Sequence, residues 1–409
     1  MQNYIVGLDI GSKTIKAAIG EASKDGKLLL IKVLKTPSDG MRKGVVDDTA
    51  EVMRSLSGIL SEIKKIAKGG VRNIFLGVGS SDVKVQSSLG VVAVSRSDYE
   101  IYEDDIQRAI QGSQAINLPP NRMVLHSIVK EFIVDGVRDI RDPIGMIGNR
   151  LEVSSLIIDA FEPAVKNLTK CVETLGGGLS GLILSPLASA RSVLSKNQKD
   201  LGVVLIDIGF GKTGMCVYEE GKLLHAAVFP VGSGNITNDL AIGLKTSVET
   251  AEVIKLSFGS ALSREIGARE SVDLSKIDPQ AKGVVAKKFI AEVIEVRLAE
   301  IFEMVNNELK AINKSGRLPG GVVLVGGGAK LPGIADLAKQ ELKLASRVGV
   351  PDISSIDVGG GELSLQIEDP EFACPLGLLL WASEKQAESK KVQLRGHGFL
   401  KNIIRYFVP

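Results

Sequence analysis

The chain has 409 residues, of which 44% are hydrophobic and 24% charged, a composition typical of a globular protein with more than one domain. A net charge of +2 and an aromatic content of 4% argue against nucleic acid as a partner. The three cysteines form no C-x-x-C pair, and no segment is long and apolar enough to span a bilayer or act as a signal peptide. We therefore expect a cytoplasmic protein whose membrane contact can only be peripheral.

A pattern near the N-terminus recurs in the middle of the chain. Residues 5–14 (IVGLDIGSKT) resemble residues 203–213 (VVLIDIGFGKT), and each copy is followed by a second strand, a turn and a third strand. Each copy places an aspartate at the tip of a buried strand, beside a glycine turn whose amides can approach an anion closely. One copy alone is equally well explained as a hairpin turn. Two copies favour a phosphate site, where an acid suits Mg²⁺ held through water.

Two later segments extend this pattern. Residues 321–325 predict a buried strand, and the glycine-rich turn 326–333 leads from it into an amphipathic helix, which leaves room for a flat group against bare backbone. A dinucleotide-binding turn is excluded because the G-x-G-x-x-G spacing is missing. Glu252 and Lys255 are three residues apart on a predicted helix and therefore share a face. By spacing alone, a surface ion pair is the better interpretation of that pair.

Together, the motifs resemble the superfamily of actin, sugar kinases and heat-shock chaperones. The resemblance implies an α/β actin-like ATPase fold, with two related domains and a cleft that holds ATP and Mg²⁺. It implies that Asp9 and Asp207 hold the metal through water. The residues that it assigns to the nucleotide are Gly11, Ser12, Lys13, Lys16, Gly209, Phe210, Gly211, Lys212, Thr213, Gly232, Gly234, Glu252, Lys255, Gly327, Gly328 and Ala329.

Three features resemble the FtsA family of bacterial actin-like cell-division proteins. They are residues 229–240 (FPVGSGNITNDL), a segment without a nucleotide motif that resembles the family's inserted α+β subdomain, and the C-terminal tail. The implied plan is a first core domain (1–81, 161–198 and 365–383), an insert (82–160), a second core domain (199–230 and 313–364), a small subdomain (231–312), a flexible linker (384–398) and a membrane-targeting helix (399–409).

The tail can also be interpreted from its own residues. Residues 399–408, placed at about 100° per residue, form a short helix with one apolar and one cationic face. Residues 383–409 contain six basic and two acidic side chains, which suits an anionic membrane surface. The alternative is a helix docked on the protein's own core, which the polar linker disfavours. The expected membrane residues are Phe399, Leu400, Lys401, Ile403, Ile404, Arg405 and Phe407.

The resemblance implies a protein that forms filaments on the cytoplasmic face of the inner membrane at the septum. It would tether the tubulin-like FtsZ there and recruit later division proteins. Arg297 is the expected FtsZ contact, and an ion pair with Glu300 or Glu292 is the alternative. Ser185 stands before the Pro-Leu-Ala run, where active members of the superfamily carry an acid or amide, so we expect slow ATP hydrolysis at most. The other interpretations are an actin-like component of type IV pilus assembly and a sugar or small-acid kinase.

Overall fold

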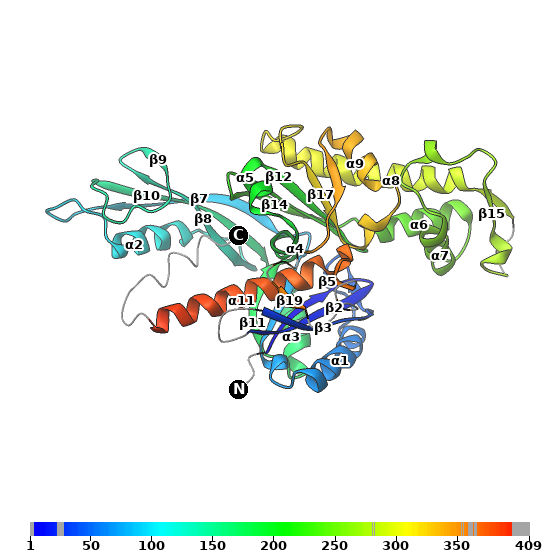
Figure 1. Ribbon diagram of the computed structural model, residues 1–409, viewed down its shortest axis with the longest axis horizontal. Helices are drawn as coiled ribbons and strands as arrows, with labels where there is room; N and C mark the ends of the chain where they lie inside the picture. Colours follow the sequence, from blue (N-terminus) through cyan, green and yellow to red (C-terminus); the bar gives the residue numbers. More distant parts are fainter. Residues whose placement is uncertain are drawn as a thin grey trace.

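The structure is a computed structural model that describes residues 4–22, 28–279, 281, 283–352, 354, 356–358, 363 and 366–394, and side chains as far as residue 385. Two mixed sheets form the centre of the molecule, and a smaller subdomain extends from each end (Figure 1).

The first core domain is a six-stranded sheet in the order β11-β6-β1-β2-β3-β19. β1 pairs with β2 antiparallel and with β6 parallel, and its side chains Ile5, Val6 and Leu8 are completely buried, as in a strand covered on both faces. The strands are β1 (Tyr4–Ile10), β2 (Thr14–Ala22), β3 (Leu28–Pro37), β6 (Ile74–Val78), β11 (Leu179–Leu184) and β19 (Ile356–Val358).

Helices α1 (Thr49–Ile66) and α3 (Glu162–Thr174) belong to this domain. Asp48 caps α1, because its side chain accepts hydrogen bonds from the backbone amides of residues 50 and 51. The buried side chains of α1 recur every three or four residues, at 52, 56, 59, 60 and 63, so one face of the helix packs against the core.

The second core domain repeats this plan in a five-stranded sheet, β14-β13-β12-β17-β18. β12 pairs with β13 antiparallel and with β17 parallel, as β1 does with β2 and β6. The predicted repeat is thus confirmed, and the two Asp-Ile-Gly hairpins occupy equivalent places. The elements are β12 (Val203–Ile208), β13 (Thr213–Glu219), β14 (Lys222–Phe229), β17 (Val322–Val325), β18 (Ser346–Val348), the 3₁₀ turn η4 (Gly327–Lys330) and α9 (Ile334–Leu342).

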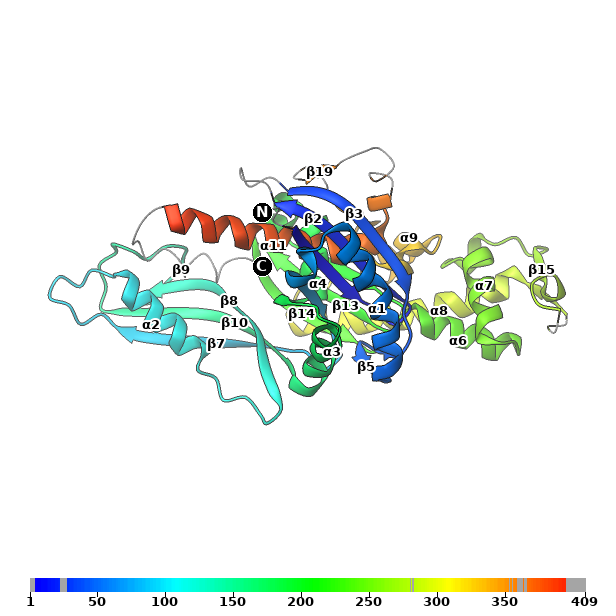
Figure 2. The same cartoon turned by 90° about the horizontal axis from the view of Figure 1, so that it is seen from below.

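Two helices join the domains. α4 (Ser185–Val193) and α11 (Ala373–Leu394) pack against each other, and one apolar core contains their side chains together with side chains from both sheets (Figure 2). The short helix η5 (Pro370–Phe372) precedes α11, and α5 (Lys196–Leu201) leads from α4 into β12. The two domains are therefore connected by well-packed helices.

The inserted subdomain forms one end of the molecule (Figures 1 and 2). Its sheet, β7-β10-β8-β9, is covered by α2, and the two layers enclose a core of their own around Ile106 and Phe132. The elements are β7 (Lys84–Ala93), α2 (Glu103–Gln114), β8 (Arg122–Val134), β9 (Val137–Ile140) and β10 (Arg150–Phe161).

The small subdomain forms the other end, where α6 and α7 pack beside the long helix α8. Its elements are α6 (Ser233–Leu244), α7 (Val248–Phe258), η2 (Ser263–Glu265), β15 (Ser271–Asp273), η3 (Leu274–Lys276), β16 (Val284–Ala286) and α8 (Lys287–Ala311). The remaining short elements are β4 (Met41–Arg42), β5 (Val45–Val46) and η1 (Gly70–Arg72).

The structure differs from the expected domain plan at three places. β19, expected within the second core domain (313–364), pairs with β3 at the edge of the first sheet. The expected boundary at residue 198 falls inside α5, whose carbonyls accept hydrogen bonds from the β13–β14 turn of the second domain. The expected linker 384–398 is helical as far as Leu394, because α11 extends from its packed half through Ala, Glu, Gln and Lys residues that favour helix.

Candidate nucleotide-binding site

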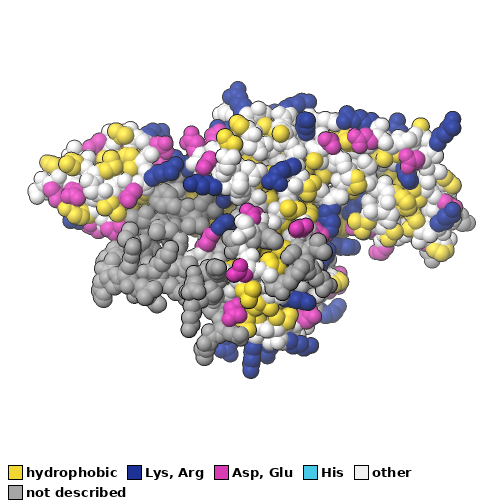
Figure 3. Space-filling view, viewed as in Figure 1, with side chains coloured by type: hydrophobic (Ala, Val, Ile, Leu, Met, Phe, Trp, Pro, Cys, Tyr) yellow, Lys and Arg dark blue, Asp and Glu magenta, His cyan; other side chains and the backbone are white. Residues whose placement is uncertain are grey.

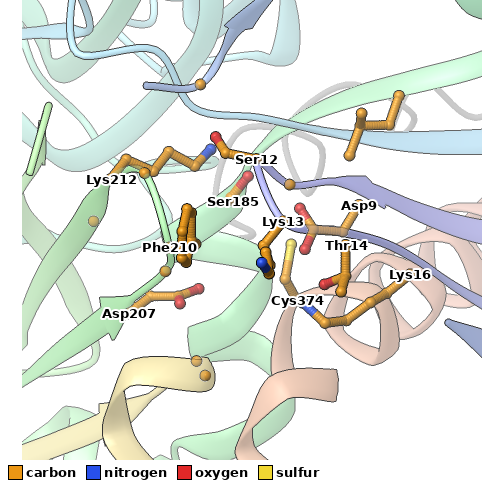
Figure 4. Close-up of a pocket in the computed structure, with 18 of the residues that line it drawn as sticks. Asp9, Ser12, Lys13, Thr14, Lys16, Ser185, Asp207, Phe210, Lys212 and Cys374 are labelled. Atoms are coloured by element: carbon orange, nitrogen blue, oxygen red, sulfur yellow. The ribbon is translucent and has the colours of Figure 1, made fainter. Parts of the chain in front are cut away.

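The turns of the two hairpins face each other across the cleft (Figure 4). The amide of Gly11 donates to the carbonyl of Thr14 at 3.1 Å, and the amide of Gly209 donates to the carbonyl of Lys212 at 2.9 Å. The two turns therefore close in the same way. They also touch, because a Cβ added to Gly211 would lie 2.6 Å from Ser12 Oγ. A larger residue at position 211 would force the Ser12 side chain to move.

Two carboxylates stand at the strand tips beside these turns. Asp9 and Asp207 both line the cavity and approach it from opposite domains (Figure 4). Burial raises the pKa of Asp207 and the charge of Asp9 raises it further, although the hydrogen bond from Ser189 Oγ at 2.8 Å opposes both effects. A divalent cation between the carboxylates would remove this repulsion. Two carboxylates with room for water are a fitting donor set for Mg²⁺, which retains much of its hydration.

The backbone around Asp207 leaves no room for another side chain. Gly326 has a φ of +85°, and a Cβ there would lie 2.4 Å from Asp207 Oδ1. The glycine after β17 is therefore required both by its left-handed backbone and by the carboxylate in front of it. Gly327, the next residue, lines the same cavity.

Lys212 and Phe210 occupy much of the space between the domains. The ammonium of Lys212 donates to the carbonyl of Gly79 at 2.8 Å and so links the second hairpin to the end of β6. The Phe210 ring lies 5.2 Å from Lys13 Nζ and 5.5 Å from Lys255 Nζ. The cavity has a volume of about 70 Å³. Since small-molecule pockets have roughly 300–1,000 Å³, a nucleotide can enter only if these two side chains move or the domains separate.

Glu252 and Lys255 form a buried pair on α7. Lys255 Nζ lies 2.7 Å from Glu252 Oε2 and 2.8 Å from Thr237 Oγ1, and it donates to the carbonyl of Ser233 at 3.2 Å. Burial lowers the pKa of Lys255, against the effect of Glu252, which raises it. The shared face predicted from the spacing is present, but the pair is buried and braces α7 against the first turn of α6, which lies next to Phe210.

The structure brings together most, but not all, of the residues expected to bind the nucleotide or its metal. Those that line the cavity are Asp9, Gly11, Ser12, Lys13, Lys16, Asp207, Gly209, Phe210, Gly211, Lys212 and Gly327. Those that do not line it are Thr213, Gly232, Gly234, Glu252, Lys255, Gly328 and Ala329. Gly232 and Gly234 pack against the turn that carries Phe210, and Gly328 packs on Ile208, so these glycines allow close contacts behind the cavity wall. Thr213 bonds to the carbonyl of residue 231.

Three cavity residues have no sequence motif that could have revealed them. Glu371 lines the cavity from η5 and accepts ion pairs from Lys35 at 2.6 Å and Lys330 at 3.0 Å, which lower its pKa to about 2 against the effect of burial. Gly44 and Cys374 also line the cavity. Ser189 also belongs to the site, because its hydroxyl donates a hydrogen bond to Asp207. It lies one helical turn after Ser185, so the spacing in the sequence could have predicted that both serines lie on one face of the helix.

Ser185 lies in the cavity, and its hydrogen-bond partners among the described residues, the carbonyl of Val78 and the thiol of Cys374, are not bases. Its hydroxyl donates to the carbonyl of Val78 at 3.1 Å, and the side chain is buried. A carbonyl cannot remove a proton from a serine, so the position lacks the carboxylate or amide that would orient a water molecule.

The remaining predicted residues lie away from the cavity. Arg297, on α8, pairs with Asp239 and Glu300, both at 2.6 Å, so the expected ion pair with Glu300 is present and its second partner is Asp239. The predicted membrane residues lie outside the described part of the chain. Within the described part, the helices are all too short or too polar to cross a membrane.

Comparison with known proteins identifies the family. A family model described as "Cell division protein FtsA" matches residues 204–377, and one described as "SHS2 domain inserted in FTSA" matches residues 80–159. A curated relative of that first name in Pseudomonas aeruginosa is 33% identical over 395 residues, covering 97% of this chain and 93% of the relative. The chain belongs to the FtsA family. Another member, in Bacillus subtilis, is 35% identical over 394 residues, covering 96% of this chain and 86% of the relative.

Solved structures share the actin-like fold at lower identity. A PilM–PilN type IV pilus biogenesis complex matches with a TM-score of 0.66 at 18% identity, covering 93% of this chain and 98% of that one. MreB5 of Spiroplasma citri bound to ADP matches with a TM-score of 0.55 at 12% identity, covering 97% and 99%. At these identities the likeness shows the fold alone. The protein is thus an actin-like cell-division protein of the FtsA family, and it has the nucleotide-binding fold of actin-like proteins.

Proposed function

We propose that the protein binds ATP and Mg²⁺ between its two hairpins and tethers FtsZ to the cytoplasmic membrane at the division septum. The observation that carries this proposal is the pair of touching hairpin turns, each with its carboxylate, in a chain of the FtsA family. Backbone amides of both turns would hold the phosphates, as polarised N–H groups do in other anion sites. Asp9 and Asp207 would hold the metal through water.

The membrane contact is assigned to the C-terminal tail. Its apolar residues, among them Phe399, Ile403 and Phe407, alternate with Lys401 and Arg405 at helical spacing. A helix of about ten residues is marginal in water, so it should fold as it enters the interface. Since each basic residue near an anionic surface contributes about 1 kcal/mol, the tail should require anionic lipid. Filaments on the membrane would multiply this weak attachment.

A groove on the small subdomain is the proposed FtsZ contact. It has a volume of about 410 Å³ and lies between α6 and α8. Ile242 and Val296 line it and are 77% and 61% exposed, beside Arg297. Exposed apolar side chains next to an arginine suit a short amphipathic segment of a partner. Later division proteins would bind other surfaces, such as the insert.

Co-sedimentation with anionic liposomes tests the two contacts separately. The chains are the full protein, a chain stopped after Arg395, and the full protein with Val296→Glu, each with ATP and FtsZ. We expect the full protein to bring FtsZ into the pellet and the shortened chain to leave both proteins in the supernatant. Val296→Glu should pellet without FtsZ. Leu256→Glu on α7, where the side chain is 73% exposed, is the matched control.

Each arm can contradict part of the proposal. If the shortened chain still pellets, the tail is not the anchor. If Val296→Glu and Leu256→Glu retain FtsZ equally, the groove is not the contact. If the full protein stays in the supernatant with anionic liposomes, the membrane-tether function is wrong.

The hydrolytic rate follows from Ser185. Because Ser185 stands before the Pro-Leu-Ala run, where an acid or amide would orient the water, we expect turnover below about 1 s⁻¹, under the usual range of metabolic enzymes. Phosphate release under saturating ATP and magnesium measures it, with Asp207→Asn as the control for contaminating ATPases. A turnover well above that value would mean that another group orients the water.

A further inference from the structure

A second cavity, of about 530 Å³, lies where the insert meets the second core domain. Its walls come from β8 of the insert, from α4 and α5, and from the turn between β13 and β14. Among the described residues, none lines both this cavity and the nucleotide cleft. It is therefore a separate site, and the proposed function gives it no role.

The lining of this cavity carries an excess of positive charge. Two of the six cations that line it form ion pairs with carboxylates that do not line the cavity: Arg191 pairs with Glu384, and Lys222 pairs with Asp139. Four cations then face two acidic residues. The four are Lys130, Arg141, Lys196 and Lys199, and the acids are Asp200 and Glu220. Figure 3 shows Lys and Arg side chains gathered at this junction between the insert and the body of the molecule.

Lys199 is the most constrained of these cations. Its ammonium lies 4.7 Å from the centroid of the Tyr218 ring, on an aromatic face, and no described carboxylate forms an ion pair with it. Burial, and then repulsion by Arg191, lower the pKa of Lys199 to about 8. A half-buried cation that lies beside another cation, and that pairs with none of the described carboxylates, is unfavourable, and an anion bound in the cavity would remove that cost.

We propose that this cavity binds a compact phosphorylated small molecule that carries at least two negative charges. Its volume falls within the roughly 300–1,000 Å³ of small-molecule sites, and phosphate oxygens accept hydrogen bonds from several Lys and Arg donors at once. The apolar side chains of Val129, Leu194 and Leu223 line the same space and would contact the uncharged part of the ligand. A ligand there would also hold the insert against the second core domain.

The test is calorimetric titration of the full chain with inorganic pyrophosphate, without magnesium. We expect Arg141→Gln/Lys199→Gln to weaken binding at least tenfold, and Lys196→Gln, which alters an exposed residue and leaves the core untouched, to weaken it about threefold. Lys13→Gln in the nucleotide cleft and Lys64→Gln on the surface of α1 should leave this binding unchanged. Circular dichroism shows whether each variant is folded.

Three results would overturn the proposal. The first is loss of pyrophosphate binding in Lys13→Gln with no change in the Arg141/Lys199 variant, which would place the anion in the nucleotide cleft. The second is equal weakening by Lys64→Gln, which would mean non-specific attraction. The third is tighter binding of a deca-glutamate peptide than of pyrophosphate to this cavity, which would make the partner an acidic peptide. Because the readout requires neither ATP, membrane nor FtsZ, failure here leaves the proposed function standing.

Discussion

At the scale of single residues, one half-buried histidine lies at the junction between the insert and the first core domain. Nε2 of His126, on β8, accepts a hydrogen bond from the amide of Leu184 at 3.0 Å, and its ring lies 5.8 Å from that of Trp381. Burial lowers the pKa of His126 from 6.5 to about 4. The histidine is therefore neutral in the folded protein at physiological pH, as its acceptor role requires.

This histidine should make stability depend on pH. Between pH 6.5 and 4 the unfolded chain protonates His126 and the folded chain does not, so the free energy of unfolding falls by about 1.4 kcal/mol per pH unit as pH decreases. His126→Gln keeps an acceptor for Leu184 and should remove this component. Urea unfolding at pH 7, 6 and 5, followed by circular dichroism, gives both slopes. Identical slopes would show that the imidazole is already protonated in the fold.

At the scale of elements, the contact between α4 and α11 holds the two core domains together. Gly377 on α11 faces α4 so closely that an added Cβ would lie 1.7 Å from the carbonyl oxygen of Ala188. Around this contact, Leu187, Leu376 and Leu379 are completely buried. The glycine is therefore required by helix–helix distance, which no feature of the local sequence reveals.

A pair of glycine substitutions tests this contact. Gly377→Ala should lower the free energy of unfolding by about 2 kcal/mol or more, because the helices must separate. Gly58→Ala on α1, where the structure gives the new methyl group no neighbour within 4 Å, should instead raise it by roughly 0.5–1 kcal/mol through helix propensity. Urea midpoints of both variants measure the difference. Equal midpoints would mean that α4 and α11 are not packed as described.

At the scale of the whole molecule, a small set of charges spans the two domains. Lys330 of the second domain pairs with Asp369 at 2.6 Å and with Glu371 at 3.0 Å, in the short helix η5 and its N-cap before α11. Glu371 also accepts from Lys35, and its side chain is 12% exposed. One carboxylate therefore neutralises cations from both sides of the nucleotide cleft.

Removing that carboxylate should loosen the cleft. Glu371→Gln leaves Lys35 and Lys330 without their shared partner, which we expect to cost about 1–2 kcal/mol at pH 7 after allowing for solvent screening. The pKa of about 2 means that this contribution is present above pH 4.5 and is lost as pH falls towards 2. Thermal unfolding of Glu371→Gln against Glu62→Gln, an exposed residue of α1, measures it. Matching transitions would show that the charges are fully screened.

The parts of the protein that repeat or follow a local period could be predicted from the amino-acid sequence. Three features are local patterns of this kind: the two Asp-Ile-Gly hairpins, the glycine turn after β17, and the shared helix face of Glu252 and Lys255. They could be predicted because strand pairing and helix geometry depend on residues close together in the sequence. The resemblance that these motifs carried also led to the correct family.

Contacts between residues that are distant in the chain became visible only in the fold. It placed Lys212 against Gly79, joined Lys330 to Glu371, and moved β19 into the first sheet. It also assembled the basic cavity from the insert and from segments that follow the insert in the chain. Such contacts depend on how whole elements pack against each other. A single lysine or a three-residue edge strand has no sequence periodicity from which its partner could be predicted.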